Sequence, residues 1–191
     1  MHRIHRTPLL PILALLGLAG CDRVCENVQG PDLSSALARE LAAIKAAQEQ
    51  EQKHLATFDD LDFNVYSNQR WDELAKSHAP DIIVHWPDGR VTTGLEPHIA
   101  DLRQQFVFAP DTKISTHPIK IADGNWTAVA GVMEGTFTQP MPMPTGKPIK
   151  PTNKPFKIDM ITIGRWENGV MKEEWLMWDN HAFMKQIGLA K

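Results

Sequence analysis

The chain has 191 residues and a formal net charge of −3 at pH 7. It carries no basic stripe with interleaved aromatic residues, which argues against nucleic acid as a partner. Its two cysteines, Cys21 and Cys25, are too few for a disulfide framework. Residues 53–191 are long enough to form one domain around a single core.

The first 20 residues have the pattern of a signal segment. Basic residues at positions 2–6 precede an almost wholly apolar run at 8–19, which is shorter than the roughly 20 residues of a typical bilayer-spanning helix. Leu18-Ala19-Gly20-Cys21 follows directly and resembles the lipobox of bacterial lipoproteins, which implies that Cys21 is acylated and begins the mature chain. The alternative is an ordinary secretory signal that leaves Cys21 a thiol.

Acylation at Cys21 would make the protein a lipoprotein of the bacterial cell envelope, with its domain in the periplasm. The choice between inner and outer membrane stays open. Residues 21–52 are expected to be a tether with a helical part, because apolar residues recur at helical spacing at Leu33, Leu37, Leu41 and Ile44. The polar run at 48–53 indicates a solvated spacer, since the heptad of a partner-binding coiled coil is not sustained.

Residues 53–191 show mainly helix patterns first and strand patterns after. Apolar residues recur at helical spacing in the stretches 53–65, 71–75 and 95–108. Strand-like runs occupy residues 81–86, 113–121, 127–138, 156–166 and 170–178, with turn residues between several of them. This order predicts an α+β domain in which a curved antiparallel sheet wraps on N-terminal helices around an open-mouthed pocket.

Asp179 stands between the last predicted strand, residues 170–178, and a short predicted helix. Strict alternation over residues 170–178 puts Asp179 on the same face as Trp175 and Met177, with Glu174, Leu176 and Trp178 on the other face. A carboxylate beside apolar groups either reaches the rim of a pocket or has its pKa changed by that pocket. The alternative is that Asp179 caps the helix predicted at 180–187, and the two roles can coexist.

Five segments in order resemble the SnoaL-like polyketide cyclase branch of the NTF2-like superfamily. They are Val84-His85-Trp86-Pro87, Phe108-Ala109-Pro110-Asp111, Ala122-Asp123-Gly124-Asn125, Gly135-Thr136-Phe137-Thr138, and Glu173-Glu174-Trp175 with Asp179 and Gln186-Ile187-Gly188. The resemblance implies a cone-shaped α+β barrel. It also implies that Asp179 matches the aspartate proposed as the base of an aldol ring closure, and that His85 matches a pocket histidine.

Two segments depart from the family pattern. Phe137 stands where the family has histidine in Gly-Thr-His, so an apolar ring replaces a polar pocket group. Residues 139–155 are rich in proline, which fixes φ and lacks an N–H, so they are expected to form a stiff loop or a lid. The expected substrate is therefore a small hydrophobic molecule, and its identity stays open.

Two classes of function follow. In the first, Asp179 abstracts a proton next to a carbonyl while neutral His85 stabilises the enolate, as in an aldol cyclase, isomerase or dehydratase. Trp86, Phe137, Trp175 and Met177 would then line the pocket. In the second, the same pocket belongs to a non-catalytic envelope module that binds a hydrophobic ligand or a protein partner. Convergence of His85 and Asp179 in one cavity would favour catalysis, and their divergence would favour binding.

No cofactor and no metal site are predicted, and a homodimer stays open. The histidines show no tight ligand spacing and no cysteine partner. Four methionines, which could suggest soft copper(I) ligands, more often fill an apolar cavity, and they are Met141, Met143, Met160 and Met177.

The lipidation hypothesis predicts that Cys21→Ser releases the protein from membranes. Two or three acyl chains hold a protein firmly, whereas one chain anchors it only marginally. Fractionation of cells expressing the wild type and Cys21→Ser measures this. Equal membrane retention of both proteins would show that the Leu-Ala-Gly-Cys sequence is not a lipidation site.

Overall fold

The computed structural model describes residues 31–191, with side chains described from Leu33 onward. The predicted signal segment and Cys21 lie outside the described residues. The chain divides into two units, one ending at Leu41 and the other running from Ala42 to Lys191. Helix α1 (Pro31–Asp60) runs without a break through the predicted spacer at 48–53. Within residues 31–191, no helix is long and apolar enough to cross a bilayer.

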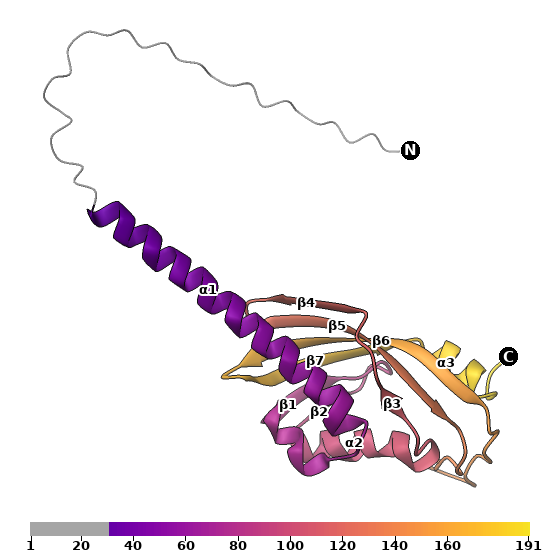
Figure 1. Cartoon of the computed structure of the whole chain (residues 1–191). Helices are drawn as coiled ribbons and strands as arrows, with labels where there is room; N and C mark the ends of the chain where they lie inside the picture. Colours follow the sequence, from indigo (N-terminus) through magenta and orange to yellow (C-terminus); the bar gives the residue numbers. More distant parts are fainter. Residues whose placement is uncertain (1–30) are drawn as a thin grey trace, which may run out of the picture. The chain divides into compact units, whose positions relative to one another are not determined.

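The second unit contains a seven-stranded sheet that curves over helical elements (Figure 1). After α1 come a π-helical turn η1 (Leu61–Tyr66), a 3-10 turn η2 (Trp71–Lys76), β1 (His78–His85), β2 (Val91–Thr93) and α2 (Leu95–Phe108). Then follow β3 (Lys113–Ile114), β4 (Ile119–Asp123), β5 (Trp126–Thr136), β6 (Pro155–Glu167), β7 (Val170–Trp178) and α3 (Asn180–Gln186).

The strand order is β2-β1-β7-β6-β5-β3, and β4 pairs with β5. Most pairs are antiparallel, but β1 and β7 run parallel, which the predicted antiparallel sheet did not include. A parallel pair needs a long crossover connection, and here α2 and five further strands supply it. The predicted α+β class, with a curved sheet on N-terminal helices, is confirmed.

Two local predictions differ from the structure. The strand expected over 113–121 is divided into β3 and β4, because Pro118 has no N–H for a ladder and residues 115–118 turn the chain. The second helix expected near Trp71 is only the 3-10 turn η2. Strand β2 was not predicted, since three residues are too few for a periodic pattern.

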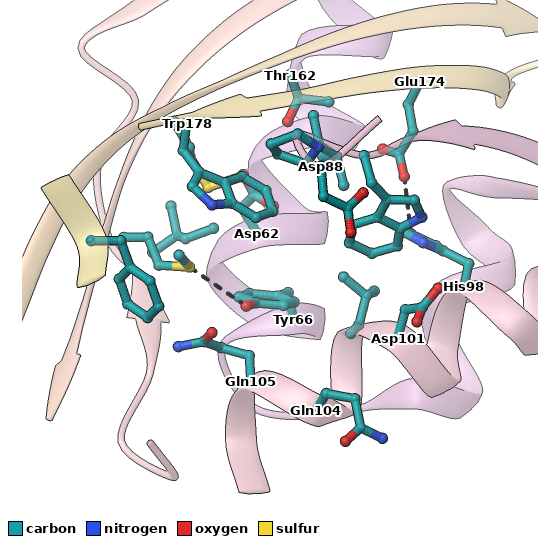
Figure 2. A pocket seen from close by; sticks show the side chains of 18 of the residues that line it. Asp62, Tyr66, Asp88, His98, Asp101, Gln104, Gln105, Thr162, Glu174 and Trp178 are labelled. Atoms are coloured by element: carbon teal, nitrogen blue, oxygen red, sulfur yellow. Dashed lines mark hydrogen bonds and ion pairs between the residues drawn. The ribbon is translucent and has the colours of Figure 1, made fainter. Parts of the chain in front are cut away.

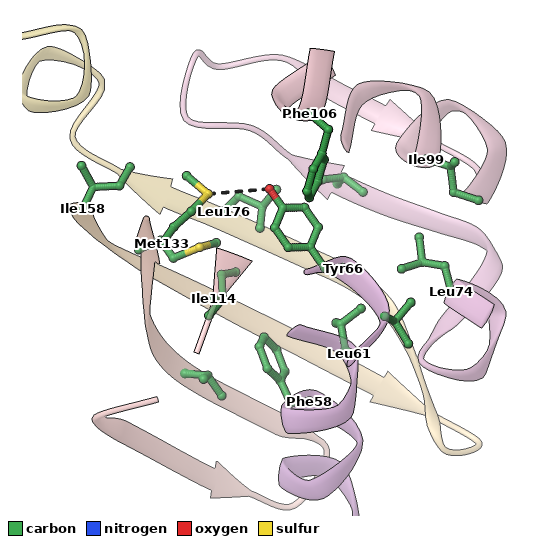
Figure 3. Close-up of a cluster of buried hydrophobic side chains, with 14 of the residues drawn as sticks. Phe58, Leu61, Tyr66, Leu74, Ile99, Phe106, Ile114, Met133, Ile158 and Leu176 are labelled. Carbon is green, nitrogen blue, oxygen red and sulfur yellow. Dashed lines mark hydrogen bonds between the residues drawn. The ribbon is translucent and has the colours of Figure 1, made fainter. Parts of the chain in front are cut away.

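The hydrophobic core lies between the helical elements and the sheet (Figure 3). Phe58 from α1 and Leu61 and Tyr66 from η1 face Ile114, Met133, Ile158 and Leu176 from the strands, with Phe106 from α2 beside them. Burying side chains of this size stabilises the fold by about 1.5–3 kcal/mol each. The helices thereby pack onto the concave side of the sheet.

An extra residue in β7 decides which of its side chains face inward. Arg165 of β6 pairs with Glu173, but the next residue, Trp166, pairs with Met171, so the register shifts at Lys172. Met171 and Glu174 are consequently both buried, although strict alternation would put them on opposite faces. From Glu174 onward, the inner face of β7 is the one that also carries Leu176.

The proline-rich segment at 139–155 has no regular strand between β5 and β6, as expected for a loop. One bridge joins Met141 to Ile149 across it. The amides of Thr138 and Gln139 donate to the carbonyl of Phe108, at 3.1 and 3.0 Å, which ties the start of the loop to the end of α2. The loop therefore packs against the helix that bounds the cavity described below.

Candidate functional site

A cavity of about 330 Å³ lies between the sheet, η1, α2 and α3. Its wall is mainly apolar, with Phe58, Leu61, Phe108, Met133, Met160 and Leu176 among the side chains that form it. A few polar groups interrupt this wall, and Figure 2 shows Asp62, Tyr66, Thr162, His98 and Glu174 among them. An apolar cavity with a small number of polar groups is the usual form of a small-molecule site.

Asp62 is a buried carboxylate on the cavity wall, only 8% exposed. It lies in the π-helical turn η1, a type of irregularity that occurs often at functional sites. Tyr66 follows one turn later and lines the same cavity. Burial raises the pKa of the Asp62 carboxyl, although a hydrogen bond from His117 opposes the rise.

His117 joins two carboxylates behind the cavity wall. Its Nε2–H donates to Oδ2 of Asp62 at 2.8 Å, and its Nδ1–H donates to Oδ1 of Asp59 at 2.7 Å. Lys120 donates to the other oxygen of Asp59 at 2.6 Å. Burial lowers the pKa of His117, but the bonds to Asp62 and Asp59 outweigh it, so the net shift is upward. His117 is therefore held as an imidazolium that orients Asp62.

A second polar group on the cavity wall consists of His78, His98 and Glu174, all buried. Nε2 of His98 lies 3.0 Å from Oε1 of Glu174, and Nε2 of His78 lies 3.7 Å from Oε2. Figure 2 shows Glu174 and His98 pointing toward each other. Burial lowers the pKa of His98 to about 4, against the attraction of Glu174, so its imidazole is neutral at physiological pH.

Of the residues predicted to form the site, Trp86 lines the cavity, where its Nε1–H donates to Oγ1 of Thr92 at 2.9 Å. Phe137 is fully buried and packs edge-on against Phe108, which forms part of the wall. Trp86 therefore forms part of the cavity wall itself, whereas Phe137 packs behind the wall and supports Phe108.

His85, Trp175 and Met177 lie on the outer face of the sheet instead of in the cavity. The ring of His85 stacks on Trp175 with centroids 4.7 Å apart, and its Nε2 lies 2.8 Å from Oε1 of Glu173. The side chain of Met177 is 43% exposed. The physical reason is the register shift at Lys172, which turns Glu174 rather than Glu173 inward.

Asp179 caps α3. Its Oδ1 accepts a hydrogen bond from the amide of Ala182 at 2.9 Å, and the residue is exposed. Asp179 therefore occupies the helix-capping position, which was the alternative prediction for this residue. Asp179 and His85 do not converge in the cavity, so the predicted catalytic pair is not brought together.

The cavity instead contains two acidic residues, Asp62 and Glu174, that the sequence does not single out by a motif. Asp62 shares a helix face with Phe58, Leu61 and Val65, and a carboxylate at such a position is itself a signal for a functional group. Glu174 shares its face with Leu176 and Trp178, which is the same signal on a strand. His78 and His98 had no local motif, because they meet Glu174 only through the fold.

The fold and the cavity define an NTF2-like domain, the class that includes ketosteroid isomerase-like folds. The family model described as SnoaL-like polyketide cyclase matches residues 61–187, and the chain belongs to this family. Comparison with curated proteins gave no match.

Solved structures show the same fold. IdmH, a putative polyketide cyclase from Streptomyces antibioticus, is 22% identical, with a TM-score of 0.59 over 71% of this chain and 98% of its own. A putative SnoaL-like polyketide cyclase from Jannaschia sp. CCS1 is 17% identical, with a TM-score of 0.63 over 74% and 95%. A hypothetical protein from Catenulispora acidiphila with a ketosteroid isomerase-like fold, crystallised with trimethylamine, is 15% identical, with a TM-score of 0.55 over 71% and 92%.

Capping by Asp179 predicts that Asp179→Asn and Asp179→Ala differ in stability. Asparagine caps a helix about as well as aspartate, so it should change the free energy of unfolding little, whereas alanine should cost about 1 kcal/mol. Chemical denaturation of the three proteins measures this. Equal losses for both substitutions would mean that the hydrogen bond to Ala182 does not stabilise α3.

The His117 bridge predicts a pH-dependent cost for His117→Gln. A histidine whose pKa is raised by folding contributes stability in full below its unfolded pKa of about 6.5 and loses it as pH rises through the folded pKa. The substitution should therefore destabilise the protein more at about pH 6 than at about pH 9. Exposed His181, replaced by glutamine, is the control. A cost for His117→Gln that is equal at both pH values would contradict the imidazolium assignment.

Proposed function

We propose that the chain catalyses proton transfer next to a carbonyl group of a small, largely apolar molecule held in the cavity. The reaction would be of the aldol cyclase, isomerase or dehydratase type, with Asp62 as the base. One observation carries the proposal: Asp62 is a buried carboxylate with a raised pKa on the wall of an apolar cavity. Membership of the SnoaL-like polyketide cyclase family supports the reaction class.

The surroundings of Asp62 suit a general base. A carboxylate is a better base for a carbon acid when its pKa lies nearer neutrality, and burial shifts Asp62 in that direction. The bond from His117 leaves the second oxygen of Asp62 for the substrate and fixes the orientation of the carboxylate. Positioning of this kind is a large part of catalysis in small enzymes.

Tyr66 can stabilise the charge that develops on the carbonyl oxygen. Its hydroxyl donates to Sδ of Met133 at 3.6 Å, and a thioether is only a weak acceptor. A substrate oxygen in the cavity would accept the same proton more strongly. Asp62 and Tyr66, one helical turn apart on η1, thus provide a base and an oxyanion donor on the same side of the cavity.

A binding function without catalysis is the second candidate. The mainly apolar wall supports it, and so does the separation of His85 and Asp179. In either case, the Leu-Ala-Gly-Cys sequence supports our further proposal that the domain works in the periplasm on a lipid anchor at Cys21.

The catalytic proposal predicts that the protein accelerates exchange of protons next to the carbonyl of small apolar ketones. Incubation in D₂O with a panel of such ketones, followed by proton NMR, detects the exchange without a known substrate. Asp62→Asn keeps the shape of the side chain and should lower the exchange rate by about a hundredfold or more.

Asp60→Asn is the matched control, because Asp60 is exposed, does not bind His117 and is not among the residues that line the cavity. It should retain most of the exchange activity. Equal rates for the wild type and Asp62→Asn would eliminate Asp62 as the base. Ketone binding without exchange in the wild type would favour the binding module.

A further inference from the structure

The cluster of His78, His98 and Glu174 is unusually short of hydrogen bonds. The three side chains are only 1%, 2% and 4% exposed. Within residues 33–191, four buried side-chain polar atoms lack a hydrogen-bond partner, and three belong to this cluster: Nε2 of His78, Nδ1 of His98 and Oε1 of Glu174. Buried polar atoms are almost always paired, so a group of three such atoms at one place is unusual.

The tautomer of His78 is fixed by its neighbour. The hydroxyl of Ser77 donates to the carbonyl of Leu74 at 3.1 Å, so its oxygen accepts from Nδ1–H of His78 at 2.9 Å. Nε2 of His78 lies 3.7 Å from Oε2 of Glu174, which is too far for a hydrogen bond. A metal ion between the two atoms could bind both. A hydrogen bond from Nδ1–H to an oxygen is the usual support of a metal-binding histidine.

We infer that His78, His98 and Glu174 bind one divalent transition-metal ion, of the Zn²⁺ class, on the wall of the cavity. Their candidate ligand atoms all lie within 4.8 Å of one another. Bonds of about 2.0–2.2 Å in a tetrahedron place ligand atoms about 3.3–3.6 Å apart. Nε2 of His98 lies 3.0 Å from Oε1 of Glu174, and Nε2 of His78 lies 3.7 Å from Oε2 of the same carboxylate, so small movements of these side chains would bring three ligand atoms to this spacing.

The ligand types also select the class of ion. Two imidazoles with one carboxylate suit Zn²⁺, Co²⁺ or Fe²⁺ better than Mg²⁺, which prefers oxygen ligands. Three protein ligands leave a fourth position of the tetrahedron open, and all three residues line the cavity, so that position faces the space for a small molecule. The inference stands apart from the proposed role of Asp62, because binding of the ion can be measured without turnover.

A second histidine–glutamate contact joins the same two strands, β1 and β7, and serves as a comparison. On the outer face, Glu173 accepts from His85 at 2.8 Å and from Arg165 at 3.2 Å. Both of its oxygens are thus satisfied by the protein itself. Glu174, the next residue, has only the two buried histidines at its oxygens and no arginine, so Glu173 and His85 serve as the matched control.

The test uses the purified full chain without a histidine tag, stripped with a chelator and titrated with ZnCl₂ in a calorimeter. We expect one Zn²⁺ per chain in this site. His98→Gln and Glu174→Gln should each weaken binding by more than about tenfold, since even changes beside a metal ligand cost that much. His85→Gln and Glu173→Gln should bind as the wild type does. Co²⁺ should give the visible absorption of a four-coordinate ion in the wild type and lose it in His98→Gln.

Misfolding of a variant is excluded by the thermal midpoint of each metal-free protein. The wild type should gain in midpoint with Zn²⁺, because an ion that binds only the folded state stabilises it. Glu174→Gln, folded in the metal-free state, should not gain. Zn²⁺ binding that is absent from the wild type, or that survives unchanged in both His98→Gln and Glu174→Gln, would overturn the inference.

Discussion

The register shift in β7 is the constraint on which the cavity depends. Trp166 pairs with Met171 while Arg165 pairs with Glu173, and the extra residue turns both Met171 and Glu174 inward. A glycine at position 164 makes room for this arrangement, because a Cβ there would lie 2.6 Å from Sδ of Met171. The strand can then present Glu174 to the cavity without losing its pairing to β6.

The helical side of the cavity depends on the π-helical turn η1. Helix α1 ends in the π-helical turn η1, which brings Asp62 and Tyr66 to the same cavity. His117 fixes this turn to the sheet, because it binds Asp62 and Asp59 from the segment between β3 and β4. His117 thus reaches the helical elements from the bend between β3 and β4, where the strand pattern of residues 113–121 is interrupted.

The sequence supports the overall fold well because periodicity and turn residues are local signals. It predicted the α+β class and placed α2, β5, β6 and β7 to within a few residues. It did not predict the inward face of β7, because Glu173 and Glu174 have the same chemistry and nothing in their order marks the extra residue. Asp62 could have been found as an acid on an apolar helix face.

Other parts of the site cannot be predicted from short stretches of sequence. His78, His98 and Glu174 come from different elements and meet only when β1 pairs in parallel with β7 and α2 packs beside them. Asp179 could be read from the sequence either as a base or as a cap, and the structure places it at the cap position. The function of a residue at a strand end therefore depends on register, which alternation alone does not supply.

The central claim is that the chemistry of this protein faces inward, at the cavity bounded by η1 and β7. A crystal structure of the protein with the molecule that co-purifies with it, or with a small apolar ketone, tests this claim most directly. We expect the ligand in the cavity, with an oxygen atom within hydrogen-bond distance of Tyr66 and its adjacent carbon beside Asp62. A ligand bound on the outer face, against His85 and Trp175, would contradict it.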